Sequence, residues 1–120
     1  MIQVYGIPNC DTVKKALQWL DGQGCNYAFH NFKKQPPNPT QATAWLAELG
    51  SEQLINRRGT TWKQLTDVQR DGAADPVLAA ALVCAHPSLI KRPLVQWRDG
   101  SWSVGFSATV WTALVQRSNI

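Results

Sequence analysis

The sequence has little of several features that mark whole classes of protein. None of its apolar runs approaches the roughly 20 residues of a membrane span, and no long apolar region follows the N-terminus as in a signal peptide. Its three cysteines, Cys10, Cys25 and Cys84, are an odd number without a C-x-x-C pair, and its two histidines are not spaced for zinc. We therefore expect a cytoplasmic protein with reduced thiols, no metal and no membrane contact.

A dense stripe of positive charge is also missing. The net charge is +4, and most basic residues stand in four scattered pairs, at 14–15, 33–34, 57–58 and 91–92. A nucleic-acid surface usually needs a denser stripe, whereas short basic pairs suit a small anionic substrate. The hydrophobic content of 44 % and the charged content of 17 % are ordinary for a globular domain. We expect one domain that acts as a monomer and has no nucleic-acid partner.

The first thirty residues predict a β-α-β unit. Residues 2–5 have the pattern of a buried strand, and Gly6 then turns the chain toward a helix that starts at Asp11. Apolar residues at helical spacing continue to Gly22, and residues 25–30 alternate as a second strand. Because the two strands flank a helix, we expect them to be parallel with a right-handed crossover.

The middle of the chain predicts helices. A polar, proline-rich connection at 33–39 precedes a helix that we expect Thr40 to cap and Gly50 to end. Asp75 and Pro76 are a typical N-cap and first helical residue, so they predict the start of another helix. No composition shift marks a domain boundary on either side of these helices.

The C-terminal part predicts two strands and a helix. Residues 94–97 and 102–106 are separated by a turn signal at 98–101, so we expect an antiparallel hairpin. Ser107 is placed to cap a last helix. The predicted fold class is α/β: a β-α-β unit and a β-β-α unit share one mixed sheet, with a helical insertion at about 40–86.

Cys10 stands where the first strand turns into the first helix. The first N–H groups of a helix have no intrahelical partner, and the helix dipole adds partial positive charge there. Such a place stabilises a thiolate. A free cysteine is more often a small buried hydrophobe. The position nevertheless favours Cys10 as a nucleophile, with Thr12 in the first turn and Lys14 one turn on as residues that stabilise its thiolate.

Cys25 and Cys84 are interpreted as structural. A helix of about ten residues separates Cys25 from Cys10 by roughly 15 Å, far beyond disulfide reach. Cys84 falls within the helical insertion and stays open only as a minor alternative for a resolving thiol. We expect a monothiol mechanism in which glutathione, the natural external thiol of a reducing cytoplasm, resolves the intermediate. His30 and His86 are given no catalytic role.

Three motifs resemble those of one known family. YGIPNCDTVKKA at 5–16, NRRGTTWKQL at 56–65 and HPSLIKRPLV at 86–95 are similar to the arsenate reductase (ArsC)/Spx-like family. With VGFS at 104–107, the chain resembles the YffB-like branch of proposed glutathione-dependent thiol reductases. The resemblance covers essentially the whole chain. It implies a thioredoxin-like fold with a helical insertion, and Cys10 as the catalytic cysteine.

The resemblance implies further site residues. Arg92 matches the arginine before the family's active-site proline, and Pro93 matches a proline that thioredoxin-like proteins hold cis. Arg58, or Arg57, matches an arginine-bearing loop. Guanidinium groups bind carboxylates bidentately, and glutathione has two carboxylates. We therefore expect these arginines and Pro93 to bind glutathione as a co-substrate, with no bound cofactor.

Two departures from the family separate the functional alternatives. Glutathione-dependent arsenate reductases have a third arginine near the start of the last helix, where this chain has Phe106. Spx regulators have a second cysteine three residues after the first, where this chain has Val13. The expected function is a glutathione-dependent thiol-disulfide oxidoreductase that acts on a small-molecule or protein disulfide, or on an oxyanion. Arsenate reduction, and a non-enzymatic Spx-like regulator that binds RNA polymerase, are the alternatives.

Overall fold

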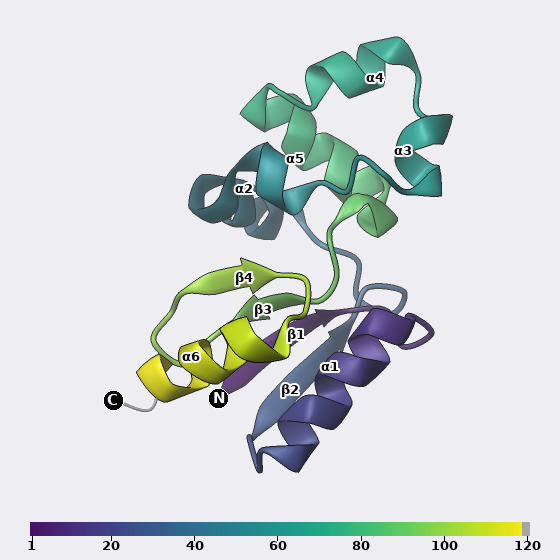
Figure 1. The fold of residues 1–120 in the computed structure, drawn as a ribbon. Coiled ribbons are helices and arrows are strands. Elements are labelled where there is room, and N and C mark those ends of the chain that lie inside the picture. Colours follow the sequence, from purple (N-terminus) through teal and green to yellow (C-terminus); the bar gives the residue numbers. More distant parts are fainter. Residues whose placement is uncertain (119–120) are drawn as a thin grey trace. The chain divides into compact units, whose positions relative to one another are not determined.

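The computed structural model describes residues 1–118 of the chain (Figure 1). The elements are β1 (Ile2–Gly6), α1 (Asp11–Gly22), β2 (Tyr27–Asn31), α2 (Pro39–Leu54), α3 (Thr60–Gln64), α4 (Asp67–Gly72), α5 (Pro76–Ala85), the 3-10 turn η1 (Pro87–Leu89), β3 (Leu94–Gln96), β4 (Trp102–Val104) and α6 (Ala108–Ser118). They form two compact units. The first unit joins residues 1–35 to the chain from Arg92 onward, and the second is Pro36–Lys91.

The first unit contains a four-stranded mixed sheet in the order β2-β1-β3-β4. β1 and β2 are parallel, and β3 runs antiparallel to both of its neighbours. The register places Tyr5 of β1 beside His30 of β2 and Leu94 of β3. The predicted β-α-β and β-β-α units, and with them the α/β fold class, are confirmed.

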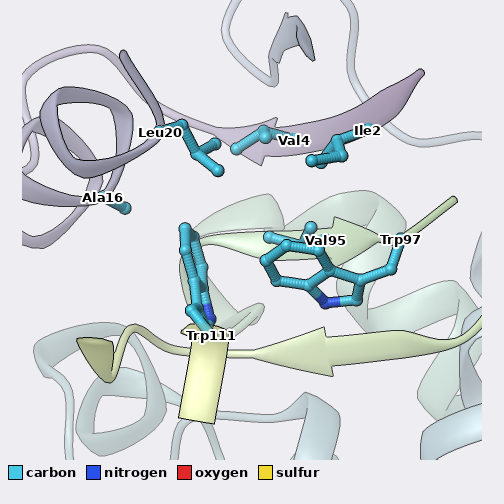
Figure 2. Close-up of a cluster of buried hydrophobic side chains, with 7 residues drawn as sticks. All are labelled: Ile2, Val4, Ala16, Leu20, Val95, Trp97 and Trp111. Carbon is cyan, nitrogen blue, oxygen red and sulfur yellow. The ribbon is translucent and has the colours of Figure 1, made fainter. Parts of the chain in front are cut away.

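One face of this sheet carries the core of the first unit. Ile2 and Val4 point to this face because strand side chains alternate, and they pack with apolar residues of α1 and α6 (Figure 2). The rings of Trp97 and Trp111 meet edge to face, with 5.0 Å between their centroids. The indole N–H of Trp97 donates to Ser103 Oγ at 2.9 Å, so this nearly buried ring leaves its donor satisfied.

The second unit is a group of short helices in which α2 packs on α5. Trp45 of α2 and Val83 of α5 are nearly or fully buried. An antiparallel bridge between Ile55 and Ile90 closes the unit, and the N–H of Lys91 donates to the carbonyl of Leu54 at 2.8 Å. This small pairing therefore joins the end of α2 to the segment in which the chain leaves the second unit.

Two of the predicted boundaries in the second unit were wrong or incomplete. The N-cap of α2 is Asn38, not Thr40: Asn38 Oδ1 accepts from the N–H of Gln41 at 2.8 Å, and Gln41 Oε1 accepts from the N–H of Asn38 at 3.1 Å. Pro39 suits the first helical position, so the cap moves to the residue before it. Gly50 interrupts α2 with φ 78°, but helical structure resumes as far as Leu54.

The second strand also begins later than the pattern predicted. β2 starts at Tyr27, whereas the alternation began at Cys25. The N–H of Cys25 donates to the carbonyl of Leu20 at 3.0 Å, so this residue still belongs to the turn that leaves α1. Side-chain alternation does not reveal such a backbone bond, and the predicted strand was therefore two residues too long at this end.

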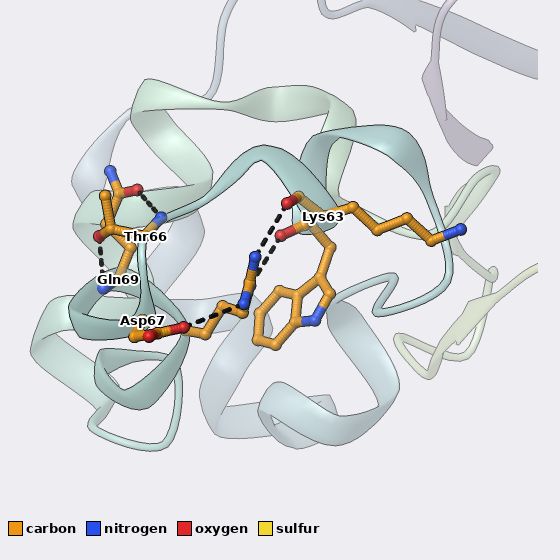
Figure 3. Close-up of polar contacts among 6 residues, drawn as sticks. Lys63, Thr66, Asp67 and Gln69 are labelled. Carbon is orange, nitrogen blue, oxygen red and sulfur yellow. Dashed lines mark hydrogen bonds and ion pairs between the residues drawn. The ribbon is translucent and has the colours of Figure 1, made fainter.

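The joint between α3 and α4 is fixed by Arg70 (Figure 3). Its guanidinium donates to the carbonyls of Trp62 and Lys63 at 3.2 and 2.8 Å, and pairs with Asp67 at 3.2 Å. Thr66 caps α4 through a reciprocal pair of hydrogen bonds with Gln69. Arg70 satisfies carbonyls at the end of α3, so its charge serves the fold of this unit.

A polar network ties the end of α6 to the β3–β4 turn. Asp99 Oδ1 accepts from the hydroxyl and the N–H of Ser101 at 2.6 and 2.9 Å. Arg117 donates to Asp99 Oδ2 at 3.0 Å and to Ser101 Oγ at 2.9 Å. The hydrogen bonds from Ser101, and then the charge of Arg117, hold the pKa of Asp99 below its ordinary value.

This network predicts a pH-dependent contribution to stability. A carboxyl whose pKa is lowered by folding stabilises the folded state above the ordinary value of about 3.9, and this contribution is lost as the pH falls through the lowered value. Asp99→Asn should therefore reduce the free energy of unfolding at pH 7, and its difference from the wild type should shrink below about pH 4. Denaturant unfolding from pH 7 to pH 2 measures this.

Asp71→Asn is the control, because the exposed Asp71 side chain makes no hydrogen bond or ion pair among residues 1–118. A loss for Asp99→Asn that is the same at every pH would contradict the role of its charge.

Gly6 lets the end of β1 come close to α1. A Cβ added there would lie 3.0 Å from Cγ2 of Val13 and 3.8 Å from Cε1 of Phe29. Val13 is fully buried, so it has little room to move away. Gly6 therefore sets the spacing between β1 and α1, the two elements that Cys10 connects.

Gly6→Ala should destabilise the protein by about 1–3 kcal/mol, the usual cost of overpacking. Gly22→Ala is the matched control, because nothing lies within 4 Å of a Cβ at Gly22 and its φ is not in the left-handed region. The double variant Gly6→Ala/Val13→Ala should lose less stability in thermal unfolding than the sum of the losses of the two single variants. Full additivity would mean that this contact does not set the spacing.

Candidate active site

Cys10 is the N-cap residue of α1. Its backbone is extended, with φ −104° and ψ 125°, and its carbonyl accepts the N–H of Lys14 at 3.0 Å. Its half-buried side chain makes no capping hydrogen bond. Ser or Asp at this position would accept from the N–H of Thr12 or Val13, so Cys10 stands at a position where these donors and the helix dipole favour an anion.

Thr12 and Lys14 lie in the first turns of α1, as predicted, and both are exposed. In the described part of the chain, neither side chain makes a hydrogen bond or an ion pair. The positive charge of Lys14 thus stays one helical turn from Cys10 without a carboxylate partner. Asp11 is the acidic residue of this first turn.

The sheet topology gathers several segments at one edge with Cys10. β1 ends at Gly6, four residues before Cys10, and the parallel β2 ends at Asn31. β3 runs the other way, so its first residue, Leu94, lies at the same edge as the end of β1. Pro93 immediately precedes Leu94. We call this end of the sheet the Cys10 edge.

The Arg92–Pro93 step is part of the Cys10 edge. Its peptide bond is cis, as the resemblance implied. Pro93 is buried, and its carbonyl accepts the N–H of Gly105 at 3.0 Å; Gly105 has φ 77°. Arg92 is half-buried, and its side chain makes no hydrogen bond or ion pair with residues 1–118. The structure thus places Arg92, Pro93 and Cys10 in one unit and at one edge.

Arg57 and Arg58 belong to the second unit, whereas Cys10 belongs to the first. The two arginines differ. The guanidinium of Arg57 lies over the ring of Trp62, 5.5 Å from its centroid. The exposed Arg58 side chain makes no hydrogen bond or ion pair among the described residues. Arg58 is therefore the arginine of the pair whose charge is available to a ligand.

The loop that presents Arg58 is held by Asn56. The N–H of Asn56 donates to the carbonyl of Leu89 at 2.7 Å, and its Oδ1 accepts from the N–H of Arg58 at 3.0 Å. A Cβ at Gly59 would lie 2.9 Å from the Asn56 amide nitrogen, so a side chain at position 59 would displace the Asn56 amide. The NRRG sequence thus fixes the backbone of an exposed arginine.

The structure gives a physical reason for Phe106. Its ring packs against the rings of Trp111 and Trp19 at the rim of the core. The distances between ring centroids are 4.8 Å to Trp111 and 6.2 Å to Trp19. Ser107 then caps α6 by accepting the N–H of Val110 at 3.3 Å. An arginine at position 106 would have to replace this aromatic contact, so the position serves packing in this chain.

The remaining thiols and histidines have structural surroundings. Cys25 packs against the core of the first unit, and Cys84 is half-buried in α5 of the second. Burial raises the pKa of the Cys84 thiol, which keeps it protonated and a poorer nucleophile. His30 Nε2 lies 2.6 Å from Gln3 Oε1, and its ring stacks on Tyr5. Neither histidine gains a catalytic role.

The sequence singled out Lys33 and Lys34 as one of four scattered basic pairs within a connection, but did not place them near Cys10. They follow β2 directly, and the N–H of Phe32 donates to the carbonyl of Gly6 at 2.8 Å. Both lysines therefore lie at the Cys10 edge. The signal that could have found them is the predicted parallel pairing, since the carboxyl ends of parallel strands meet at one edge.

Residues 1–118 contain neither a metal-binding cluster of side chains nor a helix that could span a membrane. No three or more His, Cys, Asp or Glu side chains are grouped as a metal site would require. No described helix is both long enough and apolar enough to cross a bilayer.

Known proteins resemble this chain in sequence and in structure. A solved structure named YffB protein shares 37 % identity with a TM-score of 0.87, over 96 % of this chain and 99 % of its own. An arsenate reductase (ArsC) related protein from Brucella melitensis shares 40 % identity with a TM-score of 0.75, over 93 % and 92 % of the two chains. The global transcriptional regulator Spx 1 of Lactococcus lactis is 30 % identical over 97 residues, which are 79 % of this chain and 74 % of the regulator.

The family resemblance seen in the motifs is confirmed by these relatives. They include a YffB protein, an arsenate reductase related protein and an Spx regulator, the three branches that the motifs resemble. The ArsC family model matches residues 5–114, which includes Cys10, the 57–58 pair and the 92–93 step. The chain belongs to the ArsC family.

Proposed function

We propose that the protein is a glutathione-dependent thiol-disulfide oxidoreductase that uses Cys10 as its single nucleophile. The observation that carries the proposal is the place of Cys10: it is the N-cap residue of α1 and its half-buried thiol makes no capping bond. The likeness to an arsenate reductase related protein, at 40 % identity, supports a reductase. A cytoplasmic location follows from the need for reduced glutathione, and the scheme requires only one chain.

The proposed reaction has two exchange steps. The Cys10 thiolate attacks the glutathione sulfur of a mixed disulfide, so a Cys10–glutathione disulfide forms and the substrate leaves as a thiolate that takes up a proton. A second glutathione thiolate then attacks the glutathione sulfur on Cys10. Oxidised glutathione leaves, and Cys10 returns as thiolate. In sum, the substrate mixed disulfide and one glutathione become the substrate thiol and oxidised glutathione, and the enzyme is unchanged.

The α1 amides and the arginines have separate roles in this scheme. Partial positive charge at the start of α1 stabilises Cys10 as attacking and leaving group. Arg92 and Arg58 bind the two carboxylates of glutathione, since each is without an internal ion pair among the described residues. Pro93 borders the same edge and positions the peptide part of glutathione.

Cys10→Ser should abolish turnover of a glutathione mixed disulfide, because serine cannot carry the intermediate. Cys25→Ser and Cys84→Ser should retain it. Coupled turnover and mass spectrometry check this: oxidised wild-type protein should carry one glutathione on Cys10. An intramolecular disulfide between Cys10 and Cys84 would overturn the monothiol scheme.

Arg58→Ala should raise KM for glutathione by roughly tenfold or more, the effect expected when one charge-assisted hydrogen bond is lost. Arg57→Ala is the matched control: it should change KM less and mainly lower the melting temperature, because Arg57 stacks on Trp62. Steady-state kinetics and thermal melts separate the two. Equal KM values for both variants and the wild type would remove the arginine clamp.

The alternatives make different predictions in the same experiments. Arsenate-dependent oxidation of glutathione by the wild type would favour the arsenate reductases. Co-purification with RNA polymerase that is unaffected by Cys10→Ser would favour a regulator of the Spx type. Val13 leaves such a regulator without a C-x-x-C switch, and Phe106 leaves an arsenate reductase without its third arginine.

A further inference from the structure

Charge is divided unequally between the two edges of the sheet in the first unit. Five basic residues lie at the Cys10 edge with one carboxylate, that of Asp11. The basic residues are Lys14, Lys15, Lys33, Lys34 and Arg92. At the opposite edge, two basic residues, Arg98 and Arg117, stand with two carboxylates, Asp21 and Asp99. The positive charge of this unit is therefore concentrated around Cys10.

Lys33 and Lys34 stand on a turn with a fixed backbone. The N–H of Phe32 binds the carbonyl of Gly6, which joins the turn to the segment that leads to Cys10. Asn31 Oδ1 accepts from the N–H of Lys33 at 2.9 Å, and the carbonyl of Asn31 accepts from the N–H of Lys34 at 3.1 Å. Both side chains are exposed and make no ion pair among residues 1–118.

This edge has more positive charge than glutathione requires. Glutathione has two carboxylates and one ammonium group, and the proposed clamp already assigns the carboxylates to Arg58 and Arg92. The charges of Lys33 and Lys34 then have no ion-pair partner among residues 1–118 and none on glutathione. A second anionic group, brought by the other half of the mixed disulfide, would complement them.

We propose that Lys33 and Lys34 form a docking site for acidic side chains beside the disulfide of a peptide or protein substrate. Acidic disulfide carriers are then the preferred substrate class of Cys10. The proposal rests on the proposed function for its chemistry, but the docking itself requires only the two lysines and the turn that holds them. The lysines are positioning residues, because they contact the carrier and not the sulfur atoms.

The exposure of Lys33 and Lys34 to solvent sets how strongly each can favour an acidic substrate. One exposed ion pair contributes little, so the loss of one lysine should reduce kcat/KM for an acidic carrier by roughly two- to fivefold. The preference should be largest at low ionic strength and nearly absent at about 1 M salt, where the Debye length is about 3 Å. A salt-independent preference would require direct, desolvated contacts that these exposed side chains do not offer.

The test compares two S-glutathionylated peptides of equal length, one with glutamates and one with lysines beside the modified cysteine. The wild type should turn over the acidic peptide faster, and Lys33→Gln and Lys34→Gln should each reduce that preference. Arg98→Gln is the matched control, because it removes one positive charge from the opposite edge of the same sheet and should leave the preference unchanged. Thermal melts check that each variant is folded.

A binding measurement separates this inference from the proposed function. The two peptides carry a fluorescent label, and anisotropy reports their binding to Cys10→Ser protein with and without Lys33→Gln. Lysine-dependent preference for the acidic peptide without any turnover in the wild type would retain the docking site and remove the oxidoreductase. Turnover of both peptides at equal rates, equal binding of both, or an equal effect of Arg98→Gln would overturn the docking site.

Discussion

The contact between Gly6 and Val13 is the constraint on which the candidate site depends. β1 and α1 can approach closely because Gly6 has no side chain, and the fully buried Val13 fills the space. Four residues then remain to turn the chain from strand to helix, which leaves Cys10 as the N-cap of α1. The place of the Cys10 thiol at the start of α1 is thus a consequence of core packing. Val13 cannot be exchanged for a resolving cysteine without change in that packing.

Much of the fold could be predicted from periodicity and turn residues, because these act locally. The alternation in β1, the Asp75-Pro76 start of α5 and the β3–β4 hairpin are examples. The errors arose where a backbone hydrogen bond or a competing N-cap residue determines where a helix or strand begins. Asn38 displaced Thr40 as a cap because Pro39 already suits the first helical position. Cys25 was excluded from β2 by a bond to the end of α1.

The candidate site was predictable only in part, since its residues come from distant stretches of the chain. Cys10 could be singled out by its local place, and Arg92 by its motif. The choice between Arg57 and Arg58 required a tertiary contact, the ring of Trp62 beneath one of them. Adjacent charges look alike in a sequence. They differ in the structure because one guanidinium is engaged by an aromatic face and the other is left to solvent.

The arrangement of charge links the fold to the chemistry. A net charge of +4 spread over the chain suggests little about substrates. The fold, however, places most of the basic residues of the first unit at one end of the sheet strands and balances the charges at the other end. At the far edge, Arg117 and Asp99 neutralise each other in a network that joins α6 to the hairpin. At the Cys10 edge, the lysines make no such ion pairs with the residues that the structure describes. A concentration of positive charge at this edge is the electrostatic basis of the proposed recognition of an anionic substrate beside Cys10.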